Sequence, residues 1–121
     1  RAGRRPQIAF ANGLLEELGG CLAGGLAEPF LLRLNPQGGS GSSPVVHTGL
    51  EFIYCLEGVL TYTIGSETYT LKPGDSLFFE AHLPHRWHNA GEETSCSLLV
   101  LSPKDENDQP TEFHFATSGL D

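Results

Sequence analysis

Residues 47–58 read HTGLEFIYCLEG, and residues 72–89 read KPGDSLFFEAHLPHRWHN. Each stretch contains a short run of apolar and aromatic residues bounded by glycine or proline, which is typical of a strand followed by a turn. Lys72-Pro73-Gly74-Asp75 is the strongest turn signal, because proline presets φ and glycine accepts positive φ. We therefore expect two β-hairpins in this part of the chain.

Three side chains in these stretches are good metal ligands: His47, Glu51 and, thirty-four residues after Glu51, His85. Two imidazoles and one carboxylate bind a divalent transition metal, such as iron, zinc, manganese or nickel, and leave positions open. His47 precedes Glu51 by four residues, so an uninterrupted strand would put both on one face, and Gly49 permits a bulge between them. The alternative is a vestigial site in which the three side chains hydrogen-bond to one another and to water.

The rest of the chain continues the rhythm of short strands and turns. The expected strands cover residues 29–34, 51–56, 59–64, 67–71, 76–79, 85–89 and 95–101, with an edge strand at 111–115. Residues 7–10 and 13–18 are expected as short strands or a turn of helix, and residues 38–43 as a flexible Gly/Ser loop. Many short strands without a long helix indicate an all-β sandwich or barrel, and an antiparallel double-sheet jelly roll fits the spacing.

Composition limits the classes of function. A chain of 121 residues with 39% hydrophobic and 18% charged residues is one globular domain. The formal charge of −8 argues against a nucleic-acid surface on this domain, because phosphate binding needs a basic patch. No apolar run approaches the roughly 20 residues that cross a bilayer, and no signal peptide is recognisable.

The three cysteines, Cys21, Cys55 and Cys96, are odd in number and widely spaced. This pattern argues against a disulfide framework and favours a reducing cytoplasm. Cys55 and Cys96 lie within apolar strand patterns and are expected to be buried. Residues 1–6, which carry three of the seven basic residues, are expected to be an N-terminal arm or an interdomain linker preceding a domain at 7–121.

The two stretches quoted first resemble the two conserved motifs of the cupin superfamily. The first family motif contains two histidines, a glutamate and a closing glycine; the second contains a glycine, a histidine and an asparagine. The matching residues here are His47, Glu51, Gly58, Gly74, His85 and Asn89. The resemblance implies a cupin jelly-roll β-barrel with the candidate ligands in its interior.

Three positions depart from the family pattern. Val45 stands where the first histidine is usual, Glu80 replaces a proline, and His82 stands where glycine is usual. One of the four usual ligands is therefore missing. The remaining set resembles the two-His-one-carboxylate site of non-haem iron oxygenases and the site of a cupin epoxidase of phosphonate antibiotic biosynthesis.

The residues also resemble the C-terminal cupin domains of XRE-family helix-turn-helix transcriptional regulators. That resemblance implies a non-enzymatic, effector-sensing domain, with no catalytic residue, that forms a homodimer and meets DNA only through a separate N-terminal domain. The rival hypothesis is a mononuclear metalloenzyme, an oxygenase, epoxidase or isomerase, on the same three ligands, and a plain metabolite-binding protein stays open. The residues expected to line the ligand pocket are Ile53, Tyr62, Phe79, His82 and Trp87.

Strand parity and residue type give further expectations. Inward-facing Glu51 would share its face with Ile53 and Cys55, and inward-facing His85 with Trp87 and Asn89, leaving His88 at the surface. Asn89 is expected to support a turn. The aromatic residues expected to be in the core are Tyr54, Tyr62, Phe78, Phe79 and Trp87.

Overall fold

The computed structural model describes residues 7–10, 12–18 and 27–102, and within these ranges it contains nine strands and no helix. The strands are β1 (Gln7–Phe10), β2 (Gly13–Glu17), β3 (Glu28–Leu34), β4 (Leu50–Glu57), β5 (Leu60–Ile64), β6 (Glu67–Leu71), β7 (Ser76–Glu80), β8 (His85–His88) and β9 (Ser95–Ser102). No helix in this part of the chain is long and apolar enough to cross a bilayer.

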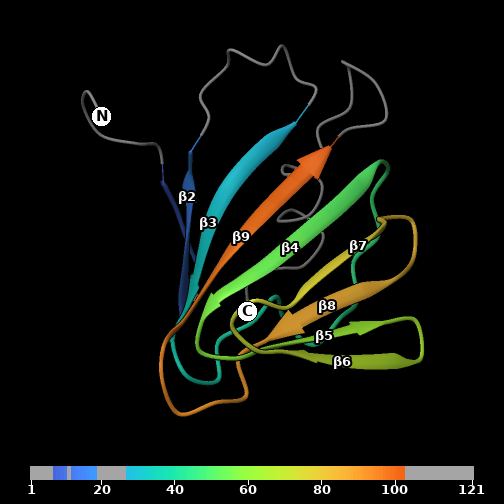
Figure 1. Ribbon diagram of the computed structural model, residues 1–121. Helices are drawn as coiled ribbons and strands as arrows, with labels where there is room; N and C mark the ends of the chain where they lie inside the picture. The colour runs from blue at the N-terminus through green and yellow to red at the C-terminus, as the bar shows by residue number, and fades with distance from the viewer. Residues whose placement is uncertain (1–6, 11, 19–26, 103–121) are drawn as a thin grey trace.

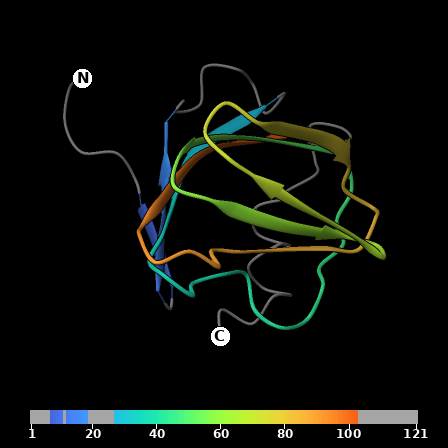
Figure 2. The same cartoon turned by 60° about the horizontal axis from the view of Figure 1, so that its bottom comes forward.

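The strands form two antiparallel sheets (Figure 1). The larger sheet has the order β1-β2-β3-β9-β4-β7, and the smaller has the order β6-β5-β8. Figure 2 shows the two sheets facing each other as separate layers. The jelly-roll sandwich predicted from the sequence is confirmed, and both N-terminal segments, β1 and β2, are strands rather than turns of helix.

The core fills the space between the sheets, and strand parity decides which residues enter it. On β4 the buried residues alternate as Glu51, Ile53 and Cys55, and on β8 His85 and Trp87 are buried while the residues after them are exposed. The apolar side chains of this core are Leu15, Phe30, Leu32, Leu34, Ile53, Cys55, Leu60, Tyr62, Leu71, Trp87, Leu99 and Leu101. Burial of this apolar surface is the main driving force that holds the two sheets together.

Two aromatic residues expected in the core lie outside it. Tyr54 is 37% exposed and Phe78 is 67% exposed. Both predictions are wrong for the same physical reason. The neighbours Ile53 on β4 and Phe79 on β7 occupy the inward positions, and the next residue of a strand must point the opposite way. Hydrophobic identity suggested burial, but strand parity overrides it.

Other expectations are met where the structure describes them. Cys55 and Cys96 are buried and free. The Asn89 side chain donates to the carbonyls of Leu34 and Glu93 and accepts from the Gly91 N–H, so it supports the turn. The expected strand at 111–115, the arm at 1–6 and Cys21 lie outside the described residues.

Candidate metal centre

Backbone hydrogen bonds bring the segment before β4 against the start of β8. Val45 and His85 exchange N–H···O bonds of 2.8 and 2.9 Å. Two residues further on, the His47 N–H donates to the Ala81 carbonyl at 3.0 Å, and the Ala81 N–H donates to the Gly49 carbonyl at 2.9 Å. These bonds place two histidines that are distant in sequence on neighbouring segments.

A glycine turn then directs Glu51 toward the same point. Gly49 has a φ of 87°, a conformation that residues with a side chain rarely adopt, and it lies between His47 and Glu51. Glu51 is the second residue of β4, where it lies opposite Leu101 on one side and Phe79 on the other. The carboxylate therefore enters the interior between two apolar neighbours.

The three candidate ligands meet in the interior of the sandwich. Nε2 of His47 and Nε2 of His85 each lie 3.1 Å from the same oxygen, Oε1 of Glu51. One ligand atom from each residue lies within 4.8 Å of the others, and the three residues are 5%, 0% and 0% exposed. Donors about 2.1 Å from one ion are separated by about 3.0 Å at right angles and by about 3.4 Å at tetrahedral angles. The observed 3.1 Å falls within that range.

The outer nitrogen of each ring is already committed. Nδ1 of His47 donates to the Thr48 carbonyl at 3.0 Å, and Nδ1 of His85 donates to the Leu83 carbonyl at 2.7 Å. A carbonyl oxygen only accepts, so each Nδ1 carries the proton and each neutral ring presents a lone pair at Nε2. This arrangement, with a backbone carbonyl behind each ring, is the one that metal-ligating histidines adopt.

Both Nε2 atoms face a carboxylate oxygen, which also only accepts a hydrogen bond. A proton on an imidazole or a divalent metal ion between the three atoms removes the repulsion that this arrangement would otherwise produce. Burial alone would lower the pKa of His85, but the Glu51 carboxylate and the Leu83 carbonyl outweigh it, and the pKa lies above its ordinary 6.5. The donor set therefore fits a metal ion, with protonation of His85 as its competitor.

Tyr62 fixes the other oxygen of the carboxylate. Its hydroxyl donates to Oε2 of Glu51 at 2.6 Å, and the residue is fully buried on β5. Burial, the charge of Glu51 and the hydrogen bond to it all raise the pKa of Tyr62 well above 10, so the hydroxyl keeps its proton. With Oε2 held by Tyr62, Oε1 is the atom that Glu51 presents to the two imidazoles.

Of the other residues expected to line a pocket, three lie in the interior or against the cluster and one, His82, lies at the surface. Ile53 and Trp87 are buried in the core, and the Phe79 ring packs edge-on against the rings of Tyr62 and His85 at centroid distances of 5.8 and 5.0 Å. His82 is at the surface, where its Nε2 pairs with Glu80 at 2.9 Å. His82 and Phe79 both line a surface hollow of about 430 Å³ beside the exposed Phe78.

The sequence reasoning included Tyr62 as a pocket residue but missed its contact with Glu51. A signal was present, because a tyrosine that alternates with apolar residues on a buried face must find a partner for its hydroxyl. Val45, at the position of the missing histidine, is fully buried, and the Val45 side chain offers no donor to the cluster.

An antiparallel jelly roll with two buried histidines and a carboxylate converging inside it defines the class of small jelly-roll proteins with a candidate internal metal site. The family model described as "Cupin domain" matches residues 30–102, which is more than half of the chain. The chain therefore belongs to the cupin family.

Two solved structures show the same fold. The Cupin_2 domain of an XRE-family transcriptional regulator from Enterobacter cloacae is 20% identical, with a TM-score of 0.69, over 78% of this chain and 99% of that one. Hydroxypropylphosphonic acid epoxidase from S. wedmorenis is 23% identical, with a TM-score of 0.69, over 80% of this chain and 55% of that one.

A curated relative is more similar in sequence over a shorter stretch. Polyketide synthase CurC from Streptomyces cyaneus is 34% identical over 53 residues, which is 44% of this chain. The match spans about a third, 34%, of that relative's length.

Proposed function

We propose that this cupin domain binds a small-molecule effector at a divalent transition metal ion held by His47, Glu51 and His85, and that it is the sensing domain of a transcriptional regulator. The observation that carries the metal part is the convergence of two Nε2 lone pairs on Oε1 of Glu51, with both Nδ1 atoms already bonded to carbonyls. Donors of this type suit iron, zinc, manganese or nickel.

The residues around the cluster have distinct parts in this proposal. His47 and His85 are held in the ligating tautomer by backbone carbonyls, and Tyr62 keeps Oε2 of Glu51 occupied. Val45 leaves one position without a protein donor. A bound ion would act there as a Lewis acid and as a template for oxygen donors of the effector.

The sensing role is supported by the likeness to the cupin domain of a regulator, which covers 99% of that domain. A charge of −8 makes this domain itself a poor DNA-binding surface, so we place DNA contact on a separate N-terminal helix-turn-helix domain. The effector would act by binding more tightly to one of two arrangements of the whole regulator.

We place the subunit contact of a homodimer on the outer face of the larger sheet. The cross-strand register aligns Pro29, Val100, Phe52 and Phe78 in one row across β3, β9, β4 and β7. Phe78 in this row is 67% exposed, and Tyr54 beside it is 37% exposed. Light scattering should give twice the chain mass for the native protein and the single chain mass for Phe78→Glu; a monomeric native protein would refute this contact.

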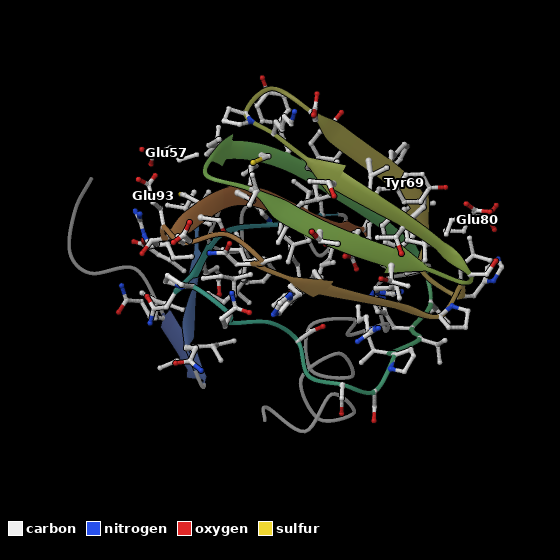
Figure 3. The ribbon with its side chains drawn as sticks, turned by 90° about the horizontal axis from the view of Figure 1, so that it is seen from below. Glu57, Tyr69, Glu80 and Glu93 are labelled. Atoms are coloured by element: carbon white, nitrogen blue, oxygen red, sulfur yellow. The ribbon has the colours of Figure 1, made fainter. Side chains whose placement is uncertain are left out.

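Metal content of protein purified without chelator tests the central proposal. We expect about one equivalent of divalent metal in the native protein after reconstitution and almost none in Glu51→Ala. Glu80→Ala is the matched control, because Glu80 is exposed at the edge of the fold (Figure 3) and pairs only with His82 among the described side chains. If none of iron, zinc, manganese and nickel binds stoichiometrically, the cluster is a vestigial site in which the three side chains are held together by hydrogen bonds rather than by a metal.

The second candidate function is a mononuclear metalloenzyme using the same ligands. It is favoured by the likeness to hydroxypropylphosphonic acid epoxidase and by the relative named polyketide synthase CurC. Turnover of an oxidisable or isomerisable substrate that is lost in His47→Ala would support the enzyme. A helix-turn-helix segment encoded upstream of Arg1, together with effector-dependent DNA binding by the longer protein, would support the sensor.

A further inference from the structure

A hollow of about 440 Å³ lies on the outer face of the smaller sheet, away from the metal centre. β8 separates the two places, since His85 and Trp87 point into the sandwich while Arg86 and His88 point out. The lining residues are Asn12, Gln37, Gly38, Gly39, Gly41, Ser42, Thr61, Thr63, Arg86, Trp87 and His88.

The floor of the hollow is a polar strand pair. Thr61 lies directly opposite His88, and Thr63 lies directly opposite Arg86, in the register of β5 and β8. Side chains opposite each other in an antiparallel pair lie on one face with Cβ atoms about 5 Å apart. Two hydroxyls, a guanidinium and an imidazole are therefore gathered on a small area.

The wall is the Gly/Ser-rich segment at 37–42, which pairs with the outer edge of β8, the end strand of the smaller sheet. The Gln37 N–H donates to the Asn89 carbonyl, and the Asn89 N–H donates to the Gly38 carbonyl, both at 2.8 Å. Gly39 pairs with His88 so closely that a Cβ on Gly39 would lie 2.6 Å from the Trp87 carbonyl oxygen. Glycine is thus required for the wall to approach the floor at this distance.

The charge of the lining is opposite to that of the chain. The chain carries 15 acidic residues, but no Asp or Glu lines the hollow. Of the other two basic residues of the described ranges, Arg33 lies on the other sheet and Lys72 shares a turn with Asp75, whose carboxylate accepts from the Lys72 N–H. In the described part of the chain, no carboxylate pairs with Arg86.

We propose that this hollow binds a small oxyanion, the phosphate or carboxylate group of an organic metabolite. Arg86 supplies a fork of donors with a permanent positive charge, and Thr61 and Thr63 supply hydroxyl donors on the same face. His88 adds a ring nitrogen that can donate. The site does not depend on the metal centre and lies on the opposite side of β8 from it.

Titration of the ¹⁵N-labelled protein, as purified, tests this site. The probes are inorganic phosphate in one arm and acetate in the other, each against sodium chloride at matched ionic strength. We expect saturable amide shifts concentrated at residues 37–42, 61, 63, 86 and 88 in at least one arm, and the arm that saturates at lower concentration identifies phosphate or carboxylate as the preferred group.

Variants separate a specific site from general attraction to positive charge. Arg86→Gln should weaken binding about tenfold or more, and Thr63→Val roughly threefold. Arg33→Gln, an exposed arginine on the other sheet, is the matched control and should leave the affinity unchanged. The proposal is overturned if neither probe gives saturable shifts, if the shifts lie at residues 47, 51 and 85 instead, or if Arg33→Gln weakens binding as much as Arg86→Gln.

Discussion

Replacing Tyr62 by phenylalanine removes a single oxygen atom from the centre of the molecule. That oxygen donates at 2.6 Å to Oε2 of Glu51, and both residues are fully buried. Hydrogen bonds to charged groups contribute about 1.5–3 kcal/mol, and loss of a group that orients a metal ligand typically costs about 10–100-fold in metal affinity. We expect Tyr62→Phe to weaken zinc binding about thirtyfold, which is about 2 kcal/mol.

Unfolding in urea measures the same effect independently. At free zinc about 1,000-fold above the native dissociation constant, bound metal should stabilise the native protein by about 4 kcal/mol. At the same zinc concentration, a thirtyfold weaker site should stabilise the variant by only about 2 kcal/mol. The chelated variant should also be less stable than the chelated native protein, because Oε2 loses its donor in a buried environment.

Competition with a chromophoric chelator gives the dissociation constants directly. Tyr69→Phe is the matched control, since Tyr69 pairs with Tyr62 across β5 and β6 but is 40% exposed. Equal zinc affinity in Tyr62→Phe and the native protein would refute the idea that Tyr62 orients Glu51. Equal weakening in Tyr69→Phe would show that the effect does not come from the hydrogen bond.

Three further predictions follow from the same structure. The pKa of His85 is raised on folding, so the stability that its protonation gives the metal-free, chelated protein is present below about pH 6.5 and is lost as pH rises through the raised pKa. Urea unfolding between pH 5 and 9 should therefore show a free energy of unfolding that falls with pH, and His85→Gln should flatten this dependence. Burial raises the pKa of the Cys55 and Cys96 thiols, so iodoacetamide should modify both more slowly in the native protein than in urea, measured in a Cys21→Ser background. Gly49→Ala places a side chain at a φ of 87° and should lower the free energy of unfolding by about 1 kcal/mol and weaken zinc binding; unchanged values would contradict the assigned role of Gly49.

Much of the fold could be predicted because its signals are local. The turn residues and the alternating strands between positions 29 and 101 gave seven strands at nearly the observed bounds. Inward positions such as Ile53 and Trp87 also followed from parity. Tyr54 and Phe78 could not be placed by residue type, because an aromatic side chain is also favourable on the outer face of a sheet, where a partner surface can cover it.

The candidate site could be predicted only in part, for reasons of distance along the chain. His47 and Glu51 share one segment, so parity and Gly49 suffice to bring them together. His85 joins them through the pairing of Val45 with β8, which no local rule encodes; the resemblance implied only that the candidate ligands lie in the interior. The hydrogen bond between Tyr62 and Glu51 joins the two sheets. Which inward-facing residues of opposing sheets touch depends on how the sheets stack, and no period within either strand encodes that.

The chemistry of the cluster bears on the choice between sensor and enzyme. General acid–base catalysis needs a group that can exchange a proton near neutral pH. The Tyr62 hydroxyl contacts the ligand set directly, and its pKa lies well above 10 because it is buried and donates to Glu51. The ring of Phe79, which packs against His85, is apolar. When His47, Glu51 and His85 hold a metal, these neighbours suit a site that holds a ligand on the metal better than one that transfers protons to it. This favours the sensing function over isomerisation, while chemistry driven by the metal itself needs no such group.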